Sequence, residues 1–304
     1  MPRIVRISSG WREAKDLDSA LSRDGDPRTS GADTIIFTIS PHASLWLDTI
    51  LSLLTLANQY AAAGIDVQLD FGQHDSKPFG FMDRLGFFDF ISDQVTVLPA
   101  RPLYSRASIY RGNSHGTVEI APIRFGEPDL DLPRRLTSAL EAACAARADV
   151  RKLGDAAWTI LSELIGNVHL HSGTRLDGFA SLQVYPGGKV VRVAVGDSGD
   201  GLLSTIRPTL LGRYPHLAAA SDSELLVEMF RQGISRFEDR KHGLGLKTCA
   251  QKAISFGADL NIRLAQQRIL LKPLQGAYQA QVHRQENLPT LDGTQIAFTF
   301  RLGS

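Results

Sequence analysis

The sequence predicts an α/β protein that is built from two domains. A length of 304 residues is typical of two domains and sufficient for a buried core. Between residues 34 and 90, the order strand, helix, strand, helix predicts a small α/β layer domain. The second half combines a long amphipathic helix with five β-patterned runs, which predicts a second domain of sheet and helices.

The composition limits the classes of partner. The formal net charge is +1, so no bulk charge favours nucleic acid or an acidic membrane surface. No apolar run approaches the ~20 residues that a membrane-spanning helix needs, and no signal-like segment follows Met1. We therefore expect a cytoplasmic protein. Cys144 and Cys249 each lie in a helical pattern and are expected to be reduced core thiols.

Residues 1–125 are predicted to form the N-terminal domain, with 1–32 as an extension that turn signals make hard to assign. Ser40 and Pro41 supply a helix cap and a proline for the first helical position. The proline- and acid-rich segment 126–133 is the expected linker. The expected elements are strands at 3–8 and 34–39, a helix ending at 63, a strand at 67–71, a helix at 77–90, and strands at 94–98 and 117–125.

Residues 134–304 form the second predicted domain, and a helix at 158–173 is its most informative element. Glu163, Asn167 and His171 follow one another at four-residue steps on one stripe of this helix. Taken alone, such a row is most simply a solvated polar face. The opposite, apolar stripe consists of Trp158, Leu161, Ile165 and Val168. The other expected elements are helices at 136–146 and 225–230, a helix that closes at Gly257, and strands at 179–185, 189–196, 259–264, 278–283 and 295–301.

Three glycine-containing motifs follow the helix. The strand at 189–196 ends in D-S-G-D-G (197–201), which places an acid at a sheet edge and follows it with backbone that a ligand can approach closely. The motif H-G-L-G-L (242–246) opens a helix and would leave its first N–H groups free for an anion. Gly293 and Thr294 precede the last strand.

In this order and spacing the motifs resemble the N, G1, G2 and G3 boxes of the GHKL ATPases, whose nucleotide site is called the Bergerat fold. The chain is most similar to the anti-sigma-factor serine kinases and histidine-kinase-like ATPase domains, because a histidine follows the asparagine by four residues. The resemblance covers roughly residues 130–304. It implies an α/β sandwich with a mixed sheet and helices on one face. The boxes are Glu163, Asn167 and His171; Asp197, Gly199 and Gly201; Gly243, Gly245 and Leu246; and Gly293 and Thr294.

The resemblance implies a site for ATP or ADP with Mg²⁺, and the residue types fit that chemistry. A buried carboxylate at Asp197 can accept a hydrogen bond from the exocyclic amine of adenine. Asn167 offers Mg²⁺ a hard oxygen ligand, and Glu163, one turn earlier, is placed as a general base for an attacking water. The remaining implied contacts are the amides of Gly243, Leu244, Gly245 and Leu246 to the phosphates, Thr294 beneath the adenine, and His171 as a phosphate contact or a structural hydrogen-bonding group.

Between the second and third boxes, the chain is expected to be irregular for about forty residues and to form a lid. A capping box at 221–224 begins the one helix that we expect there. In GHKL proteins this segment closes over the nucleotide, so Arg236, Arg240 and Lys241 could contact phosphate. They could equally be solubilising charges. The first part of the segment 202–241 has few apolar residues, so we expect it to be mobile without ligand.

The segment 79–88 (F-G-F-M-D-R-L-G-F-F) follows a strand and resembles the STAS-like domains that precede GHKL domains in some bacterial regulatory proteins. STAS antagonists carry a phosphorylatable serine or threonine between such a strand and helix, where this chain has Ser76. The neighbours Asp75 and Lys77 differ from the small residues usual in the family, which favours an ordinary loop serine over a phosphorylation site at Ser76.

Three functions remain open from the sequence. The first is an ATPase in which bound nucleotide switches assembly or partner binding, and the second is a serine/threonine kinase that acts on a STAS partner. The third is a nucleotide-responsive binding module with little turnover. The presence of Glu163 favours turnover. The expected partner is another protein, or a second copy of the chain, that contacts the STAS-like domain or the lid.

Overall fold

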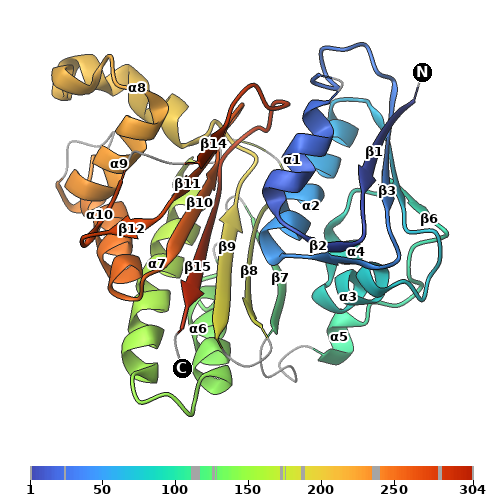
Figure 1. Cartoon of the computed structure of the whole chain (residues 1–304), viewed down its shortest axis with the longest axis horizontal. Coiled ribbons are helices and arrows are strands. Elements are labelled where there is room, and N and C mark those ends of the chain that lie inside the picture. Colours follow the sequence, from blue (N-terminus) through green and yellow to red (C-terminus); the bar gives the residue numbers. More distant parts are fainter. Residues whose placement is uncertain are drawn as a thin grey trace.

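Two sheets, each accompanied by helices, organise the chain in a computed structural model (Figure 1). The predicted α/β class is thereby confirmed. The structure describes residues 2–23, 25–110, 117–124, 127, 129–171, 174, 176–185, 189–234, 240–279 and 283–302. For residues 110, 117, 118, 170, 171, 240–244 and 283 it describes the backbone alone.

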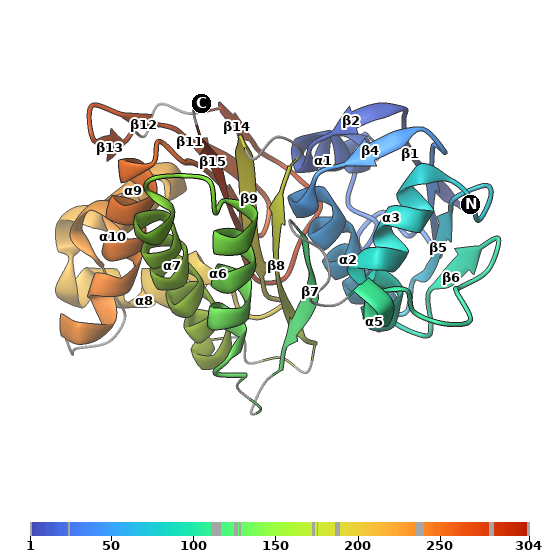
Figure 2. The same cartoon turned by 90° about the horizontal axis from the view of Figure 1, so that it is seen from below.

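The N-terminal sheet has four parallel strands. Each new strand is added on the same side of the preceding one, so right-handed crossovers place the connecting helices on one face of the sheet (Figure 2). The strands, in spatial order, are β1 (Arg3–Ile7), β3 (Thr34–Ile39), β5 (Asp66–Asp70) and β6 (Thr96–Leu98). The helices are α1 (Ala14–Ser22), α2 (Leu47–Ala62), α3 (Lys77–Leu85), α4 (Phe87–Phe90) and α5 (Ala107–Tyr110).

Two of these helices differ from the sequence prediction. Residues Ala43–Leu45 form a short strand, β4, which pairs with β2 (Gly10–Arg12), so α2 begins at Leu47 and Pro41 is not its first residue. The helix expected at 77–90 is divided into α3 and α4 at Gly86. In both cases a local interruption changes where the helix begins or ends. The predicted succession of strand, helix, strand and helix is still present as β3, α2, β5 and α3.

The C-terminal sheet has seven strands, and every neighbouring pair in it is antiparallel. The prediction of a mixed sheet is therefore wrong. For two of the pairs the connection length is the reason: only residues 185–189 separate β8 from β9 and only residues 264–267 separate β10 from β11, too few to connect parallel strands. The strands, in spatial order, are β14 (His283–Gln285), β11 (Arg268–Leu271), β10 (Asp259–Arg263), β15 (Gln295–Arg301), β9 (Val190–Gly196), β8 (Gly178–Val184) and β7 (Thr117–Ile123). A separate two-stranded hairpin consists of β12 (Pro273–Leu274) and β13 (Ala277–Tyr278).

Strand β7 is found in a different sheet from the one predicted. We expected the strand at 117–125 to complete the N-terminal sheet, but β7 pairs with β8 at the edge of the seven-stranded sheet. Its residue Ile123 is buried in the core beneath α6 and α7. A pattern of β-forming residues predicts that a strand exists but does not identify the strand that will pair with it.

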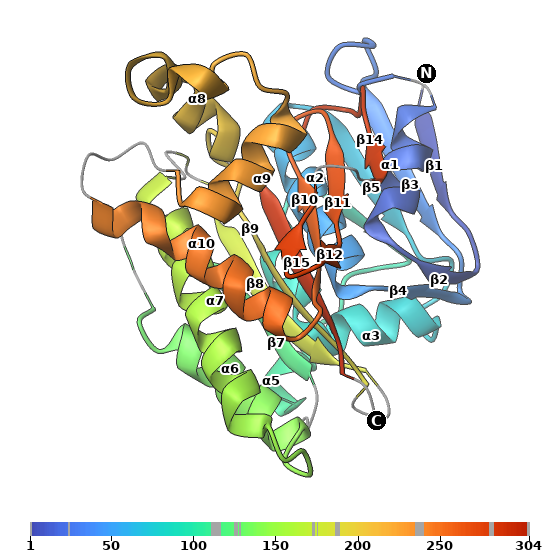
Figure 3. The same cartoon turned by 60° about the vertical axis from the view of Figure 1, so that its left-hand side comes forward.

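One face of the seven-stranded sheet is covered by helices from the same half of the chain, as predicted (Figure 3). The three apolar residues Leu161, Ile165 and Val168 of the long helix α7 are buried there, whereas Trp158 is 52% exposed and does not belong to the buried stripe. The helices of this half are α6 (Leu132–Ala143), α7 (Val150–His171), α8 (Leu202–Arg213), α9 (Asp222–Gln232) and α10 (Arg240–Ser255), with one 3₁₀ turn at Pro215–Leu217.

The other face of this sheet packs against the N-terminal half, and helix α2 lies between the two sheets (Figures 1 and 2). Alternate residues of β9 serve the two faces: Val193 contributes to the core beneath α7, and Ala194 to the core that contains α2. Because α2 is enclosed on nearly all sides, most of its residues are apolar. Four of its five buried polar residues form one stripe, Asp48, Ser52, Thr55 and Gln59, and the fifth is Thr49.

Two expectations about the chain as a whole can be compared with the structure. Cys144 and Cys249 are both free and buried, as predicted. Within the described residues, none of the helices has the length and apolar character needed to cross a membrane.

Candidate functional site

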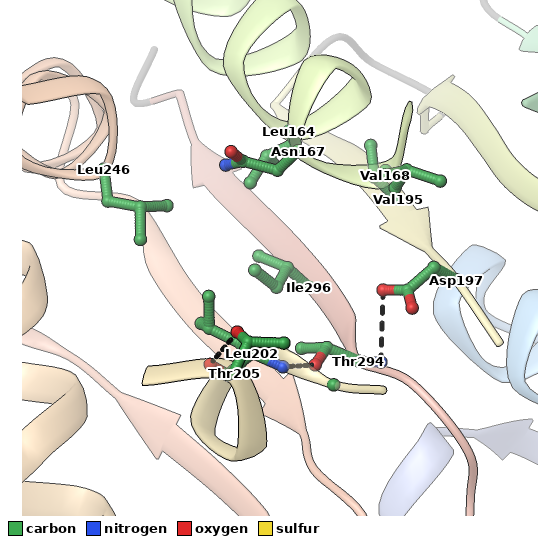
Figure 4. A pocket seen from close by; sticks show the side chains of 11 residues that line it. Leu164, Asn167, Val168, Val195, Asp197, Leu202, Thr205, Leu246, Thr294 and Ile296 are labelled. Carbon is green, nitrogen blue, oxygen red and sulfur yellow. Dashed lines mark hydrogen bonds between the residues drawn. The ribbon is translucent and has the colours of Figure 1, made fainter. Parts of the chain in front are cut away.

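The four predicted motifs converge on one pocket in the C-terminal half, with about 490 Å³ of empty space that is partly open to solvent (Figure 4). Its wall is mostly apolar, and its polar side chains are few, which is typical of small-molecule sites. The lining residues are Leu164, Asn167 and Val168 of α7, Val195 of β9, Asp197 and Gly201 after that strand, Leu202 and Thr205 of α8, Leu246 of α10, and Thr294 and Ile296 before and in β15.

Asp197 places a partly buried carboxylate at one side of the pocket. Its Oδ1 accepts a hydrogen bond from the amide of Gly199 at 2.8 Å, and its Oδ2 accepts one from the amide of Thr294 at 3.2 Å. Burial raises the pKa of this carboxyl group, and the two amide hydrogen bonds oppose that rise. The carboxylate is thus held in position by backbone groups from two different segments.

Gly293 and Thr294 pack directly on the segment that carries Asp197. Gly293 has a φ of +88°, and a β-carbon at this position would overlap with the backbone carbonyl of Asp197. The backbone of Thr294 is also bonded to Asp197: the amide of Asp197 donates a hydrogen bond to the Thr294 carbonyl at 3.0 Å. The Thr294 hydroxyl also accepts a hydrogen bond from the amide of Leu202 at 2.8 Å, which ties the start of α8 to the same corner of the pocket (Figure 4).

On α7, Asn167 and Glu163 are neighbours, but they face different surroundings. Asn167 lines the pocket, and its Nδ2 donates to Glu163 Oε1 at 3.4 Å. Glu163 is not one of the lining residues. Its carboxylate lies against Gly245 of α10, so closely that a β-carbon on that glycine would overlap with it. The predicted pair is therefore brought together, with the asparagine toward the pocket and the glutamate toward α10.

Helix α10 begins earlier than the sequence suggested. It starts at Arg240, so the segment from Gly243 to Leu246 lies inside its first two turns instead of opening it. The amides of Leu244, Gly245 and Leu246 then fall within the helical hydrogen-bond pattern, because only the first four N–H groups of a helix are left over. The prediction that these glycines open the helix is wrong. Glycine is tolerated inside this helix, and Gly245 in addition allows the close approach of Glu163.

The segment after Gly201 is more regular than expected. Residues that we expected to be irregular form α8, and α9 extends beyond the helix predicted at 225–230. Leu203, Ile206 and Leu210 of α8 are buried in the core. The expectation that this part has too few apolar residues to pack is therefore wrong, because the three buried residues lie on one side of α8.

Several predicted contacts cannot be placed. His171 is the last residue of α7, and Leu244, Arg240 and Lys241 belong to α10, but their side chains lie outside the described part of the structure. Arg236 lies outside the described residues altogether.

Ser76 immediately precedes α3 and has only 3% of its surface exposed. In this conformation, its hydroxyl group is not accessible to a phosphoryl donor. The loop that carries it would have to open before any transfer could take place.

The sequence reasoning missed the contribution of the N-terminal half to this site. Gln59 of α2 is buried and donates a hydrogen bond to the Ser198 hydroxyl at 3.0 Å, directly beside Asp197. A sequence signal for it was present, because Asp48, Ser52 and Gln59 recur at helical spacing within a helix whose residues are mostly apolar. Such a polar stripe indicates a second, polar surface on the buried helix.

No protein-family model matches the chain, and no curated protein matches it significantly. The chemistry of the pocket must therefore be deduced from its own residues.

Proposed function

We propose that the chain binds ATP or ADP with Mg²⁺ in this pocket and that it is a GHKL-type ATPase acting as a nucleotide-controlled switch. The observation that carries the proposal is the convergence of Asn167, Asp197, Leu246 and Thr294 from four distant segments on one pocket. Each comes from a different one of the four boxes that the sequence suggested. In this proposal the N-terminal half is the STAS-like regulatory part.

The chemistry of the pocket suits an adenine ring. Val168, Val195 and Ile296 provide apolar surface for a flat base. Asp197 provides a partly buried acceptor whose position is fixed by two backbone amides. An exocyclic amine that donates to this carboxylate would offset part of the cost of burying its charge.

The residues on α7 suit a magnesium–phosphate complex. The Nδ2 of Asn167 donates to Glu163, which leaves the amide oxygen of Asn167 as the atom to bind Mg²⁺. Mg²⁺ prefers such hard oxygen ligands and completes its octahedral shell with phosphate oxygens and water. Glu163 is the candidate general base for the water that attacks the γ-phosphate.

A second candidate is a nucleotide-responsive binding module with little turnover. It is favoured by the position of Glu163, whose carboxylate lies against Gly245 of α10 and does not line the pocket. Hydrolysis would then require the start of α10 to move away from α7. A serine/threonine kinase of the anti-sigma-factor type remains the third candidate, with a STAS-like partner as its substrate.

Calorimetric titration with ATP and Mg²⁺ tests the binding proposal. We expect the wild-type protein to bind and the folded variant Asp197→Asn to bind much more weakly, because the variant loses the charged acceptor but keeps its size. Equal affinity in the two proteins would rule out this site. Incubation with γ-labelled ATP then separates the candidates: label in free phosphate indicates an ATPase, label on protein indicates a kinase, and neither indicates a binding module.

A further inference from the structure

We infer that the N-terminal half sets the affinity of the pocket for the base of the nucleotide, and that Gln59 is the positioning residue through which it does so. This inference rests on the proposed function for its ligand. The contacts that support it involve described residues of α2, of the segment 26–28, and of the two loops at 197–199 and 290–294.

Gln59 joins three segments with one side chain. Its Nε2 donates to the Ser198 hydroxyl at 3.0 Å and to the carbonyl of Asp292 at 2.8 Å. Its Oε1 accepts from the amide of Asp292 at 3.0 Å and from the Arg28 guanidinium at 3.2 Å. With 2% of its surface exposed, Gln59 makes these bonds where water cannot readily replace them.

A second set of contacts holds the same loop from the N-terminal side. Arg28 forms an ion pair with Asp292, with both nitrogen–oxygen distances at 2.9 Å. Asp26 accepts from the amides of Arg28 at 2.9 Å and of Thr290 at 2.7 Å. The segment from Thr290 to Asp292 is therefore attached to the N-terminal half at both of its ends.

These attachments lie one or two residues from the groups that position the Asp197 carboxylate. Ser198 stands between Asp197 and Gly199, whose amide donates to Oδ1. Asp292 stands two residues before Thr294, whose amide donates to Oδ2. Gln59 thus links the two loops behind the carboxylate, and a displacement of α2 would change the distance between them. Asn167, the proposed magnesium ligand, is on α7, outside this linkage.

The test compares Gln59→Ala with Asn58→Ala. Asn58 is the adjacent amide on α2, and it joins two N-terminal segments in the same way, through the Phe90 carbonyl at 3.0 Å and the Ser92 amide at 2.8 Å, without a contact to the pocket loops. The affinities for ATP and for ITP, which lacks the exocyclic amine, are measured by calorimetry with Mg²⁺. We expect Gln59→Ala to weaken ATP binding about tenfold, as the loss of one or two buried hydrogen bonds would, and to weaken ITP binding less.

The ratio of the two affinities is the decisive readout, because a general loss of stability would weaken both nucleotides alike. Asn58→Ala should leave both affinities within about twofold of wild type, since it disturbs the N-terminal half alone. If Gln59→Ala does not fold, Ser198→Ala removes one of the same hydrogen bonds and should lower the ATP to ITP ratio in the same direction. An unchanged ratio in the folded variant would overturn the inference and leave nucleotide binding intact.

A measurement without nucleotide separates this inference from the proposed function. Hydrogen exchange of the amides of Gly199 and Thr294 in the ligand-free protein should be faster in Gln59→Ala than in Asn58→Ala. Equal exchange would contradict the positioning role, whatever the ligand is. A wild-type protein that binds neither nucleotide would instead overturn the proposed function and, with it, the ligand named here.

Discussion

The carboxylate of Glu163 on α7 occupies the space in which a β-carbon of Gly245 on α10 would lie. The two helices are therefore in very close contact at this point, and glycine is the residue that permits it. The contact also fixes where the start of α10 sits relative to Asn167, one turn along α7. Substitutions at Gly245 should thus report on the packing of the two helices.

We expect Gly245→Ala to displace the Glu163 carboxylate, which is the flexible end of that side chain. The cost of this displacement should offset the gain of about 1 kcal/mol that alanine brings inside a helix, so that the stability of the variant stays close to that of wild type. Gly212→Ala in α8 is the matched control, since no atom lies within 4 Å of its β-carbon position. That variant should be up to about 1 kcal/mol more stable than wild type. Urea unfolding of both variants measures the difference, and equal effects would contradict the close contact.

Glu163 and Asn167 should have separable roles. Glu163→Ala should keep ATP bound and lose turnover by about 10²–10⁴-fold, the range typical of a general base. Asn167→Ala should lose the part of ATP affinity that depends on Mg²⁺. Titrations with and without Mg²⁺, together with phosphate release, distinguish the two effects. Wild-type turnover in both variants would show that the assigned chemistry is wrong.

The raised pKa of Asp197 predicts a pH dependence of stability. The folded, ligand-free protein binds this proton more tightly than the unfolded chain does. The contribution of Asp197 to the free energy of unfolding therefore falls as the pH rises from the ordinary aspartate pKa of about 3.9 through the raised value. Asp197→Asn lacks this contribution. In urea unfolding, the stability of wild type relative to the variant should decrease as the pH rises above about 4, and an increase would contradict the assignment.

Asp18 of α1 connects the two halves through a buried charge cluster. It accepts hydrogen bonds from the guanidinium groups of Arg263 on β10 and Arg268 on β11, and all three residues are buried. Asp18→Asn leaves two buried arginines without their counter-charge, which should cost about 3–5 kcal/mol of unfolding free energy.

The control for Asp18 is Asp259→Asn, which disrupts an ion pair with Arg301, whose side chain is 63% exposed. It should cost less than about 1 kcal/mol. Chemical denaturation compares the two variants. A cost for Asp18→Asn no larger than that of the control would show that the charge cluster does not hold the two halves together.

Much of the fold could be predicted because it is determined by local patterns. Strands β3 and β15 have the predicted limits, since each is a run of alternating or β-branched residues that needs no knowledge of its neighbours. The convergence of Asn167, Asp197 and Thr294 was also expected. That expectation rested on the resemblance of their motifs, in order and spacing, to the boxes of the GHKL ATPases.

The features that could not be predicted depend on distant contacts. Strand β7 pairs with β8 and packs beneath α6 and α7. The amino-acid pattern of β7 alone does not indicate which strand it pairs with. Helix α8 contains Pro208, which in a sequence favours an irregular segment, yet buried leucines on one side of the helix stabilise it. Helix α10 begins at Arg240, before the glycines that the sequence pattern places at its start.

The enclosed position of α2 has a consequence for how the polypeptide acquires its structure during synthesis. The bonds that cover its polar stripe join residues far apart in the chain: Gln59 and Asp292 are separated by 233 positions, and Ser52 and Gln295 by 243. While the ribosome is still translating the second half, an N-terminal half that has already emerged exposes α2 to water and to other nascent chains. Such long-range contacts form slowly, and surfaces left open meanwhile are prone to aggregation. The N-terminal half therefore depends on the completion of β15 for its own protection, and we expect it to need chaperones until that strand is in place.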